Sequence, residues 1–336
     1  MKEPPPYYVP VFTDACPQWI WEVVLVGYEA IPDYPVKSWR EVRGWNDSLL
    51  MTESGGLAKI RPSDEYECLY KQMNIFPDIV FTLDFPTKMK RPQLKGDSLA
   101  KRMEEWKFPE PVKIRRVKKT VESAKIAMKM KPEIESLFEH EFELFGVIQG
   151  YDLNSIIYCT EEIYSLGYEF FGAGVVPTDP AFRGTTATSM LAIIRDIIGR
   201  KSWLHLLGVT DENILLRTKG LYDSFDSAYV SIQAKNAQLV HPDGTTSYIG
   251  RKIDERRKGS LKWFEFSPVH KEDYFILQEV NFVNYVTNLY RLGIITHGKE
   301  YHKKAEERVK KKIEERRRNN KAPFSTLESL DLGQIQ

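Results

Sequence analysis

Short apolar runs alternate with amphipathic stretches over most of the chain, and this alternation constrains the fold more than any other feature. We predict strands at Trp21–Tyr28, Ser48–Thr52, Asp78–Asp84, Leu144–Gln149, Glu169–Val176, Trp203–Val209 and Leu221–Asp226. Helices are predicted at Ser63–Met73, Ile114–Met130, Asn154–Leu166, Thr188–Gly199 and Asp211–Lys219. Such alternation is typical of βαβ units and a parallel sheet. We therefore expect an α/β fold, a (β/α)8 TIM-like barrel with C-terminal helices.

The pattern changes after the last of these strands. We predict two further strands, at Tyr229–Gln233 and Ser247–Arg251, with a turn between them at 241–244. Two long helices are predicted to follow, at Lys271–Leu292 and Lys299–Asn320. The expected organisation is a barrel domain over residues 1–270, a C-terminal helical extension over 271–321 and a disordered tail over 322–336.

Positive charge is concentrated in two segments of a chain whose net charge is only +1. Lys88–Lys131 contains 15 Lys and Arg against 5 Asp and Glu, and His302–Lys321 contains 10 against 4. The first segment interrupts the barrel pattern directly after a strand, so we treat it as a basic insertion. Because phosphate contacts dominate nucleic-acid affinity, this segregation indicates a polyanionic partner. Two solvated helical faces would give the same pattern.

Cysteine usage and hydropathy indicate the compartment. The three cysteines, Cys16, Cys68 and Cys159, are scattered, which is typical of a reducing cytoplasm and predicts neither a disulfide framework nor a metal site. No uncharged apolar stretch reaches the roughly 18 residues of a membrane span, so we expect a cytoplasmic protein without a membrane partner.

Polar residues gather where the predicted strands end, which is where barrel enzymes place their active sites. Glu53, Asp84, Gln149 and Asp226 each close a different strand, and glycines near Gly174 close another. Three carboxylates and an amide suit glycosidic-bond chemistry, because one carboxylate attacks or stabilises an anomeric carbon while another moves protons. Each residue taken alone is more often a helix cap or a loop acid, but the place of all four at the same end of successive strands favours a functional role.

These residues carry a resemblance to a known family. Thr52-Glu53-Ser54-Gly55-Gly56, Asp78-Ile79-Val80 with Asp84, Phe145–Gly150, Ala173-Gly174-Val175, Leu206–Val209 and Asp223–Ser227 occur in order between about residues 48 and 237. In this series the chain resembles the tRNA-guanine transglycosylase (queuine tRNA-ribosyltransferase) superfamily. The resemblance implies a pentosyltransferase that exchanges a guanine for a free 7-deazaguanine base through a covalent aspartyl-glycosyl intermediate, without a cofactor.

The resemblance also assigns roles. Asp226 would be the nucleophile and Glu53 the general acid and base, at a position where the family has Asp. The residues implied to bind the substrate are Asp84, Gln149, Gly174, Leu207 and Lys235. Asp223 is a rival acid that we interpret as structural.

The sequence departs from the tRNA enzymes in one respect that bears on the substrate. No cysteine follows Cys159, so the family's structural zinc site, which lies after the nucleophile strand, has no ligands here. This chain is most similar to the zinc-free, DNA-modifying branch that includes deoxypurine-in-DNA protein A, so we favour DNA as the partner and tRNA as the alternative. A catalytically inactive nucleic-acid-binding barrel subunit and a plain nucleoside or glycoside hydrolase remain open, as does the oligomeric state.

Overall fold

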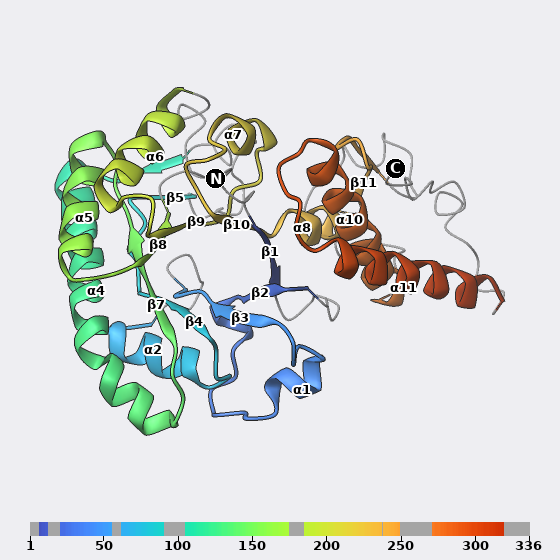
Figure 1. Ribbon diagram of the computed structural model, residues 1–336, viewed down its shortest axis with the longest axis horizontal. Helices are drawn as coiled ribbons and strands as arrows, with labels where there is room; N and C mark the ends of the chain where they lie inside the picture. Colours follow the sequence, from blue (N-terminus) through green and yellow to red (C-terminus); the bar gives the residue numbers. More distant parts are fainter. Residues whose placement is uncertain are drawn as a thin grey trace, which may run out of the picture. The chain divides into compact units, whose positions relative to one another are not determined.

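The barrel is formed by eight parallel strands within the part of the chain that the computed structural model describes, residues 7–12, 21–55, 62–90, 105–174, 185–236, 238–248 and 271–318. These strands are β1 (Tyr7–Phe12), β2 (Val23–Val26), β3 (Leu49–Thr52), β4 (Ile79–Phe81), β7 (Glu143–Ile148), β8 (Phe170–Ala173), β9 (Trp203–Leu206) and β10 (Ser224–Ser227). They pair in chain order, and β10 closes the ring on β1 (Figure 1). The predicted (β/α)8 fold is confirmed.

Helices alternate with these strands. They are η1 (Tyr28–Ala30), α1 (Trp39–Arg43), α2 (Glu65–Met73), α4 (Glu110–Phe138), α5 (Leu153–Ser165), α6 (Thr185–Ile198) and α7 (Glu212–Arg217). Figure 1 shows α2, α4, α5 and α6 outside the ring of strands. Local chemistry starts two of them: Asp64 and Asp152 are N-caps whose carboxylates accept backbone N–H groups that have no partner within the helix. The five predicted helices match α2, α4, α5, α6 and α7.

The strand β1 was not predicted. Its sequence, Tyr7–Phe12, contains Pro10, and a proline inside an apolar run argues against a strand because it cannot donate to the ladder. In the barrel Pro10 lies opposite Ser227 and the strand pairs on both sides, with β10 and with β2. Closure of the ring therefore outweighs the loss of one donor.

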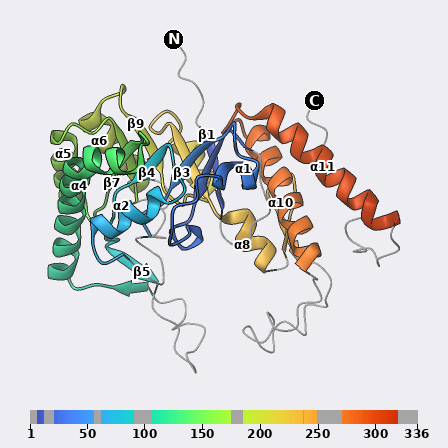
Figure 2. The same cartoon turned by 90° about the horizontal axis from the view of Figure 1, so that it is seen from below.

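The described part of the basic insertion predicted at residues 88–131 contains two short strands and the beginning of a long helix. β5 (Lys88–Lys90) and β6 (Glu105–Lys107) form an antiparallel pair, and residues 91–104 lie outside the described part of the chain. The remainder is the amino-terminal part of α4, which is longer than predicted and continues through Pro132. Figure 2 shows β5 beside the amino-terminal end of α4.

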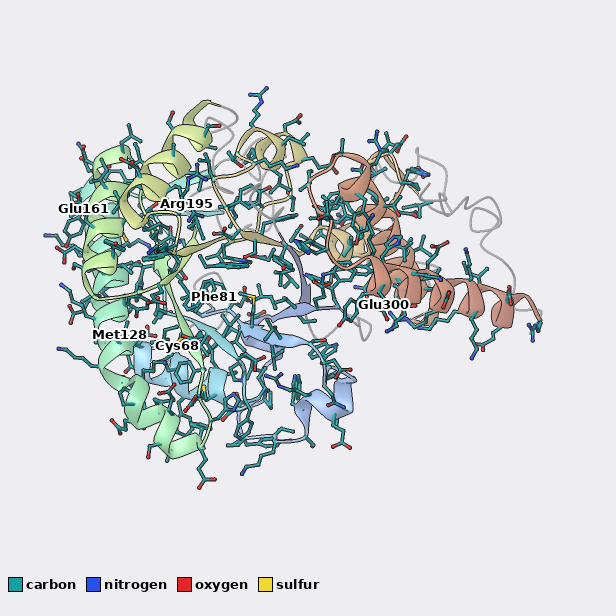
Figure 3. All side chains as sticks on the ribbon, viewed as in Figure 1. Cys68, Phe81, Met128, Glu161, Arg195 and Glu300 are labelled. Carbon is teal, nitrogen blue, oxygen red and sulfur yellow. The ribbon has the colours of Figure 1, made fainter. Side chains whose placement is uncertain are left out.

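The interior of the barrel is packed. Val9, Leu25, Met51, Phe81, Phe145 and Val147 form one buried cluster, each contributed by a barrel strand. The rings of Phe81 and Phe145 lie 5.0 Å apart between centroids, and Figure 3 labels Phe81 inside the ring of strands. Side chains from β1, β2, β3, β4 and β7 thus fill the centre, as is usual in this fold. A functional site in this barrel is therefore restricted to the ends of the strands.

The chain divides into two compact units, and the division falls between Ser227 and Ala228. The second unit also includes Trp21 and Glu22, and its elements are α8 (Tyr229–Lys235), β11 (Gln238–Val240), β12 (Thr246–Tyr248), α10 (Lys271–Arg291) and α11 (Lys299–Arg318). Figure 2 shows α10 and α11 side by side, in agreement with the two predicted long helices. The predicted end of the barrel domain, residue 270, is later than this division, and the tail 322–336 lies outside the described residues.

One predicted strand is wrong. Tyr229–Gln233 is part of the helix α8, although its last four residues alternate between β-branched and polar side chains. The buried positions Val230, Ser231 and Ala234 follow helical spacing, because the segment packs against α10 and β11. The turn at 241–244 is confirmed, with Gly244 at a φ of +85° and its N–H bonded to the carbonyl of His241.

An asparagine of α10 explains why β11 belongs to the second unit. Asn281 accepts a hydrogen bond from the N–H of Val240 at 2.8 Å and donates one to the carbonyl of Gln238 at 2.9 Å. These bonds satisfy the edge of the short β11–β12 pair, which would otherwise carry unpaired backbone groups. No helix among the described residues is long and apolar enough to cross a membrane.

Candidate active site

Six of the seven residues that the sequence singles out lie at one end of the barrel. Because all eight strands are parallel, their carboxyl-terminal ends form a single face, which we call the mouth. The six residues at the mouth are Glu53 after β3, Asp84 after β4, Gln149 after β7, Gly174 after β8, Leu207 after β9 and Asp226 within β10. Lys235 ends α8 in the second unit, so it belongs to a different compact unit from the other six.

Asp226 has a carboxylate with two distinct oxygens. Its Oδ1 accepts a hydrogen bond from the backbone N–H of Gly208 at 2.8 Å and contacts Nε2 of His205 at 3.0 Å. No described residue hydrogen-bonds to Oδ2. The side chain of Asp226 is almost completely buried, and the residue pairs with Val9 of β1 in the barrel. Contacts with Gly208 and His205 thus hold Oδ1 in place, whereas Oδ2 is available for contact with a ligand.

His205 is a residue of this site that the sequence analysis missed. It is fully buried, and its two ring nitrogens contact Asp226 Oδ1 and, at 2.8 Å, Ser224 Oγ. Trp203 donates its indole N–H to the same Ser224 Oγ at 2.8 Å. A signal was present in the sequence: His205 is the one charged or titratable side chain in the otherwise apolar strand β9, at an alternate position that faces the interior.

Glu53 lies beside both aspartates. The pKa of its carboxyl is raised from 4.5 to about 7, first by burial and then by the negative charges of Asp226 and Asp84, whereas a hydrogen bond from the N–H of Tyr28 opposes the shift. That hydrogen bond reaches Oε1 at 3.2 Å, and the side chain keeps some exposed surface. A carboxyl with this pKa exchanges protons readily near neutral pH.

The turn that carries Glu53 depends on a glycine. Gly55 has a φ of +73°, and a Cβ at this position would lie 2.7 Å from Cγ of Tyr28. Only glycine fits both the left-handed backbone and this contact. Ser54, which lies between Glu53 and Gly55, donates its hydroxyl to Oδ1 of Asp84 at 3.0 Å. The turn therefore ties the ends of β3 and β4 together.

Asp84 and Gln149 form a buried pair. Nε2 of Gln149 donates to Oδ2 of Asp84 at 2.6 Å. Gly174 lies against this amide, since a Cβ there would be 2.3 Å from Gln149 Nε2. The ends of β4, β7 and β8 thus converge on one carboxylate and one amide.

A layer of buried contacts holds these strand ends. Glu65 of α2 accepts the N–H of Leu83 at 2.8 Å, and burial raises the pKa of its carboxyl well above the ordinary value. Thr87 donates its hydroxyl to the carbonyl of Gly150 at 2.7 Å, which joins the segments after β4 and β7. Such support fixes the geometry of residues at strand ends.

Asp223 and Leu207, two further residues named from the sequence, lie in different parts of the barrel. Asp223 lies at the opposite, amino-terminal end of β10, where its carboxylate pairs with Arg195 at 2.7 Å and accepts the N–H of Leu204 at 2.7 Å. This position, away from the mouth, agrees with the interpretation of Asp223 as structural. Leu207 packs against the apolar cluster of the barrel, and its Cδ1 would be 3.4 Å from a Cβ on Gly172.

Cations and aromatic rings meet near the start of α4. The ammonium of Lys113 lies 5.3 Å from the ring centre of Tyr151, which follows β7 at the mouth. Arg116 lies 4.8 Å from the ring centre of Phe108 and donates to the carbonyl of Pro86, and Lys119 lies 5.3 Å from the ring centre of Phe85. We call these three cations the α4 basic cluster.

The cations of α11 have different surroundings. Those whose side chains are described are mostly engaged with glutamates, in the pairs Lys304–Glu300, Lys310–Glu306, Lys311–Glu315, Arg318–Glu314, Arg308–Glu279 and Lys312–Glu279. Such pairing leaves less charge for a polyanion than the sequence count implies.

Among the described residues, no group of three or more His, Cys, Asp or Glu side chains is arranged to hold a metal ion. No family model matches the chain, and no curated protein is significantly similar to it.

Proposed function

We propose that this protein is a pentosyltransferase of the guanine transglycosylase type, which replaces guanine in DNA by a 7-deazaguanine through a covalent aspartyl-glycosyl intermediate. The observation that carries the proposal is the arrangement of Asp226, Glu53 and the Asp84–Gln149 pair. The carboxylate of Asp226, whose Oδ1 is held by Gly208 and His205, lies close enough to raise the pKa of Glu53. The charge of Asp84 raises the pKa of Glu53 as well.

The exchange consists of two displacements. In the first, Oδ2 of Asp226 attacks C1′ of the target nucleoside, the bond from C1′ to the guanine nitrogen breaks, and protonated Glu53 gives its proton to the departing base. In the second, the incoming base loses its N–H proton to the Glu53 carboxylate and attacks C1′ from the vacated side, and the bond to Asp226 breaks. Two inversions give retention, and no electrons leave the substrates, so no redox cofactor is needed.

Asp84 and Gln149 suit the edge of a guanine or a 7-deazaguanine. The edge presents two N–H donors beside one carbonyl acceptor, which a carboxylate and an amide N–H complement. The Gln149 amide has a second N–H beyond the one given to Asp84, so it has a donor for the base carbonyl. Hydrogen bonds to both groups would discriminate guanine from adenine strongly, because the wrong base would leave buried polar groups unpaired.

DNA is the polymer that we favour, with tRNA as the alternative. The α4 basic cluster and the neighbouring aromatic rings offer phosphate contacts and stacking surfaces to an unstacked strand. The target nucleotide must leave its helix, because C1′ and the base edge are otherwise inaccessible to a carboxylate at a barrel mouth. A cytoplasmic location is part of the same proposal.

Incorporation of a labelled base tests the proposal. We would incubate the protein with radiolabelled guanine and, separately, with duplex DNA, single-stranded DNA and tRNA, with Asp226→Asn as the matched inactive control. Label in DNA that depends on Asp226 supports the proposal, and label in tRNA alone makes the protein a zinc-free tRNA enzyme. Base release without incorporation identifies a hydrolase. Binding of a polymer with neither reaction identifies an inactive binding subunit.

A further inference from the structure

Four side chains from β9 and β10 form a continuous hydrogen-bonded chain. Trp203 bonds to Ser224, Ser224 to His205 and His205 to Asp226, with distances of 2.8, 2.8 and 3.0 Å. The pairing of the two strands creates this chain, because His205 and Ser224 are direct neighbours in the register. It ends on the same Asp226 oxygen that accepts the N–H of Gly208.

The chemistry of the donors sets the direction of the chain. The Trp203 indole can only donate, so Ser224 Oγ accepts from it. The hydroxyl hydrogen of Ser224 then has Nδ1 of His205 as its acceptor, which leaves the ring proton on Nε2. In that tautomer Nε2–H donates to Oδ1 of Asp226, and both ring nitrogens of His205 and the hydroxyl of Ser224 have partners.

His205 is too deeply placed to touch a substrate. It is fully buried, and its ring lies 5.4 Å from that of Phe81 and 6.4 Å from that of Phe145, between centroids. These rings belong to the packed interior beneath the mouth. Any contribution of His205 to the reaction therefore acts through Asp226.

We propose that His205 is a positioning residue that fixes the Asp226 carboxylate and stabilises its negative charge, so that the aspartyl ester is a good leaving group in the second displacement. This inference rests on the proposed base exchange. When Oδ2 of Asp226 bonds to C1′, Oδ1 becomes the carbonyl oxygen of an ester. When the incoming base displaces the ester, the C1′–Oδ2 electron pair returns to the carboxylate, and the charge shared by Oδ1 is stabilised by the N–H groups of His205 and Gly208.

The prediction that distinguishes this role is an imbalance between the two steps. Donors to Oδ1 make Asp226 a weaker nucleophile and a better leaving group, so their loss slows ester cleavage more than ester formation. A variant without the donor is expected to lose exchange while the fraction of protein covalently bound to DNA rises. Damage to the fold alone would lower both quantities.

Three substitutions of His205 separate positioning from packing. His205→Gln keeps an amide N–H near the place of Nε2, His205→Asn puts its amide near the place of Nδ1, and His205→Leu removes both donors. We expect exchange to fall roughly 10²-fold in the Leu and Asn variants, with the Gln variant partly restored. Ser224→Ala removes the hydroxyl that keeps the ring proton of His205 on Nε2. We expect this variant to have an intermediate effect on exchange.

The experiment measures exchange of labelled guanine and the fraction of protein trapped on DNA after rapid denaturation. Lower exchange with more trapped protein in the Leu and Asn variants supports the inference. Equal loss in all three variants without accumulation of adduct overturns it, as does wild-type exchange in His205→Leu. A wild-type protein without exchange on any polymer instead removes the proposed function, and this inference with it.

A spectroscopic measurement does not depend on activity. Nitrogen-15 NMR of labelled protein distinguishes the Nε2–H from the Nδ1–H tautomer of a histidine. We expect Nε2–H for His205 in the wild type and an altered ring spectrum in Asp226→Asn. An Nδ1–H tautomer in the wild type would mean that His205 offers no donor to Asp226, and it overturns the inference even where exchange occurs.

Discussion

The amide of Gln149 donates a 2.6 Å hydrogen bond to the carboxylate of Asp84, although the two residues are 65 positions apart in the chain. The bond joins the end of β7 to the segment after β4, which are neighbours in the barrel. Both side chains are buried, so each depends on protein groups rather than on bulk water for its hydrogen bonds. A pair of this kind is prepared to exchange its mutual bond for bonds to a ligand with a complementary edge.

Removal of the Asp84 carboxylate should therefore affect the base more than the polymer. Hydrogen bonds to a charged group are worth about 1.5 to 3 kcal/mol, so we expect Asp84→Ala to weaken binding of free guanine roughly 10- to 100-fold. Binding of DNA, measured by fluorescence anisotropy, should change by less than about threefold. Equal weakening of both would mean that Asp84 is structural. Gln149→Leu, which removes the other partner, is the companion variant.

Gly174→Ala tests the same contact by sterics. The new Cβ would lie 2.3 Å from Gln149 Nε2, which is the far end of a flexible side chain, so we expect Gln149 to move rather than the barrel to unfold. Guanine binding should fall about tenfold, with a loss of stability below about 1 kcal/mol. Gly146→Ala is the control, because its Cβ would lie 2.5 Å from Cγ2 of Ile163 in the core. The control should lose more stability by chemical denaturation, and the reverse order would contradict the argument.

Asp226→Asn should remove exchange and any covalent adduct while the protein stays folded. Asparagine keeps an oxygen to accept the N–H groups of Gly208 and His205, so we expect a melting temperature within a few degrees of the wild type. Activity should fall on the order of 10⁴-fold or more. Asp223→Asn is the matched comparison: it should keep the chemistry but lose about 1 to 3 kcal/mol, because Arg195 is left without its anionic partner. Full activity in Asp226→Asn would end the proposal for the nucleophile.

The sequence predicted the arrangement at the mouth because parallel strands impose it. Once the strands were identified from the apolar pattern, Glu53, Asp84, Gln149 and Asp226 had to meet at one end. His205 could not be predicted in this way, because its contact with Asp226 depends on the register of β9 against β10. The helix α8 was wrongly predicted as a strand because a segment of five residues is too short to distinguish the helical period from the strand period, and its packing against α10 decides between them. The pKa of Glu53 likewise depends on distances that only the folded chain sets.

The raised pKa of Glu53 predicts opposite pH dependences for the two half-reactions. Departure of guanine needs the protonated carboxyl and should slow as pH rises above about 7, whereas attack by the incoming base needs the carboxylate and should slow below about 7. Single-turnover measurements of adduct formation and adduct cleavage across pH 5 to 9 would separate the two. Glu53→Gln should remove both dependences, and an unchanged profile in that variant would assign them to another group.

Stability should depend on the same group. A carboxyl whose pKa is raised on folding, here from 4.5 to about 7, destabilises the folded state above pH 7, and the effect disappears as pH falls to about 4.5. Glu53→Gln removes that charge, so we expect it to stabilise the protein by about 1 to 2 kcal/mol at pH 8, a value reduced for the partial exposure of the side chain. Denaturant titrations at pH 8 and pH 5 provide the comparison. A gain that is equal at both pH values would rule out a charge effect.

The two basic regions should contribute unequally to DNA binding. Lys113 and Lys119 lie on α4 over aromatic rings beside the mouth, whereas Lys304 and Lys311 of α11 are each paired with a glutamate one helical turn away. Each phosphate contact adds about one unit to the slope of log affinity against log salt, so Lys113→Gln with Lys119→Gln should reduce that slope by about two. Lys304→Gln with Lys311→Gln, which removes the same charge, should change it by less than about one. Fluorescence anisotropy at several salt concentrations measures both slopes, and equal reductions would mean that net charge, rather than the position of α4 at the mouth, governs DNA binding.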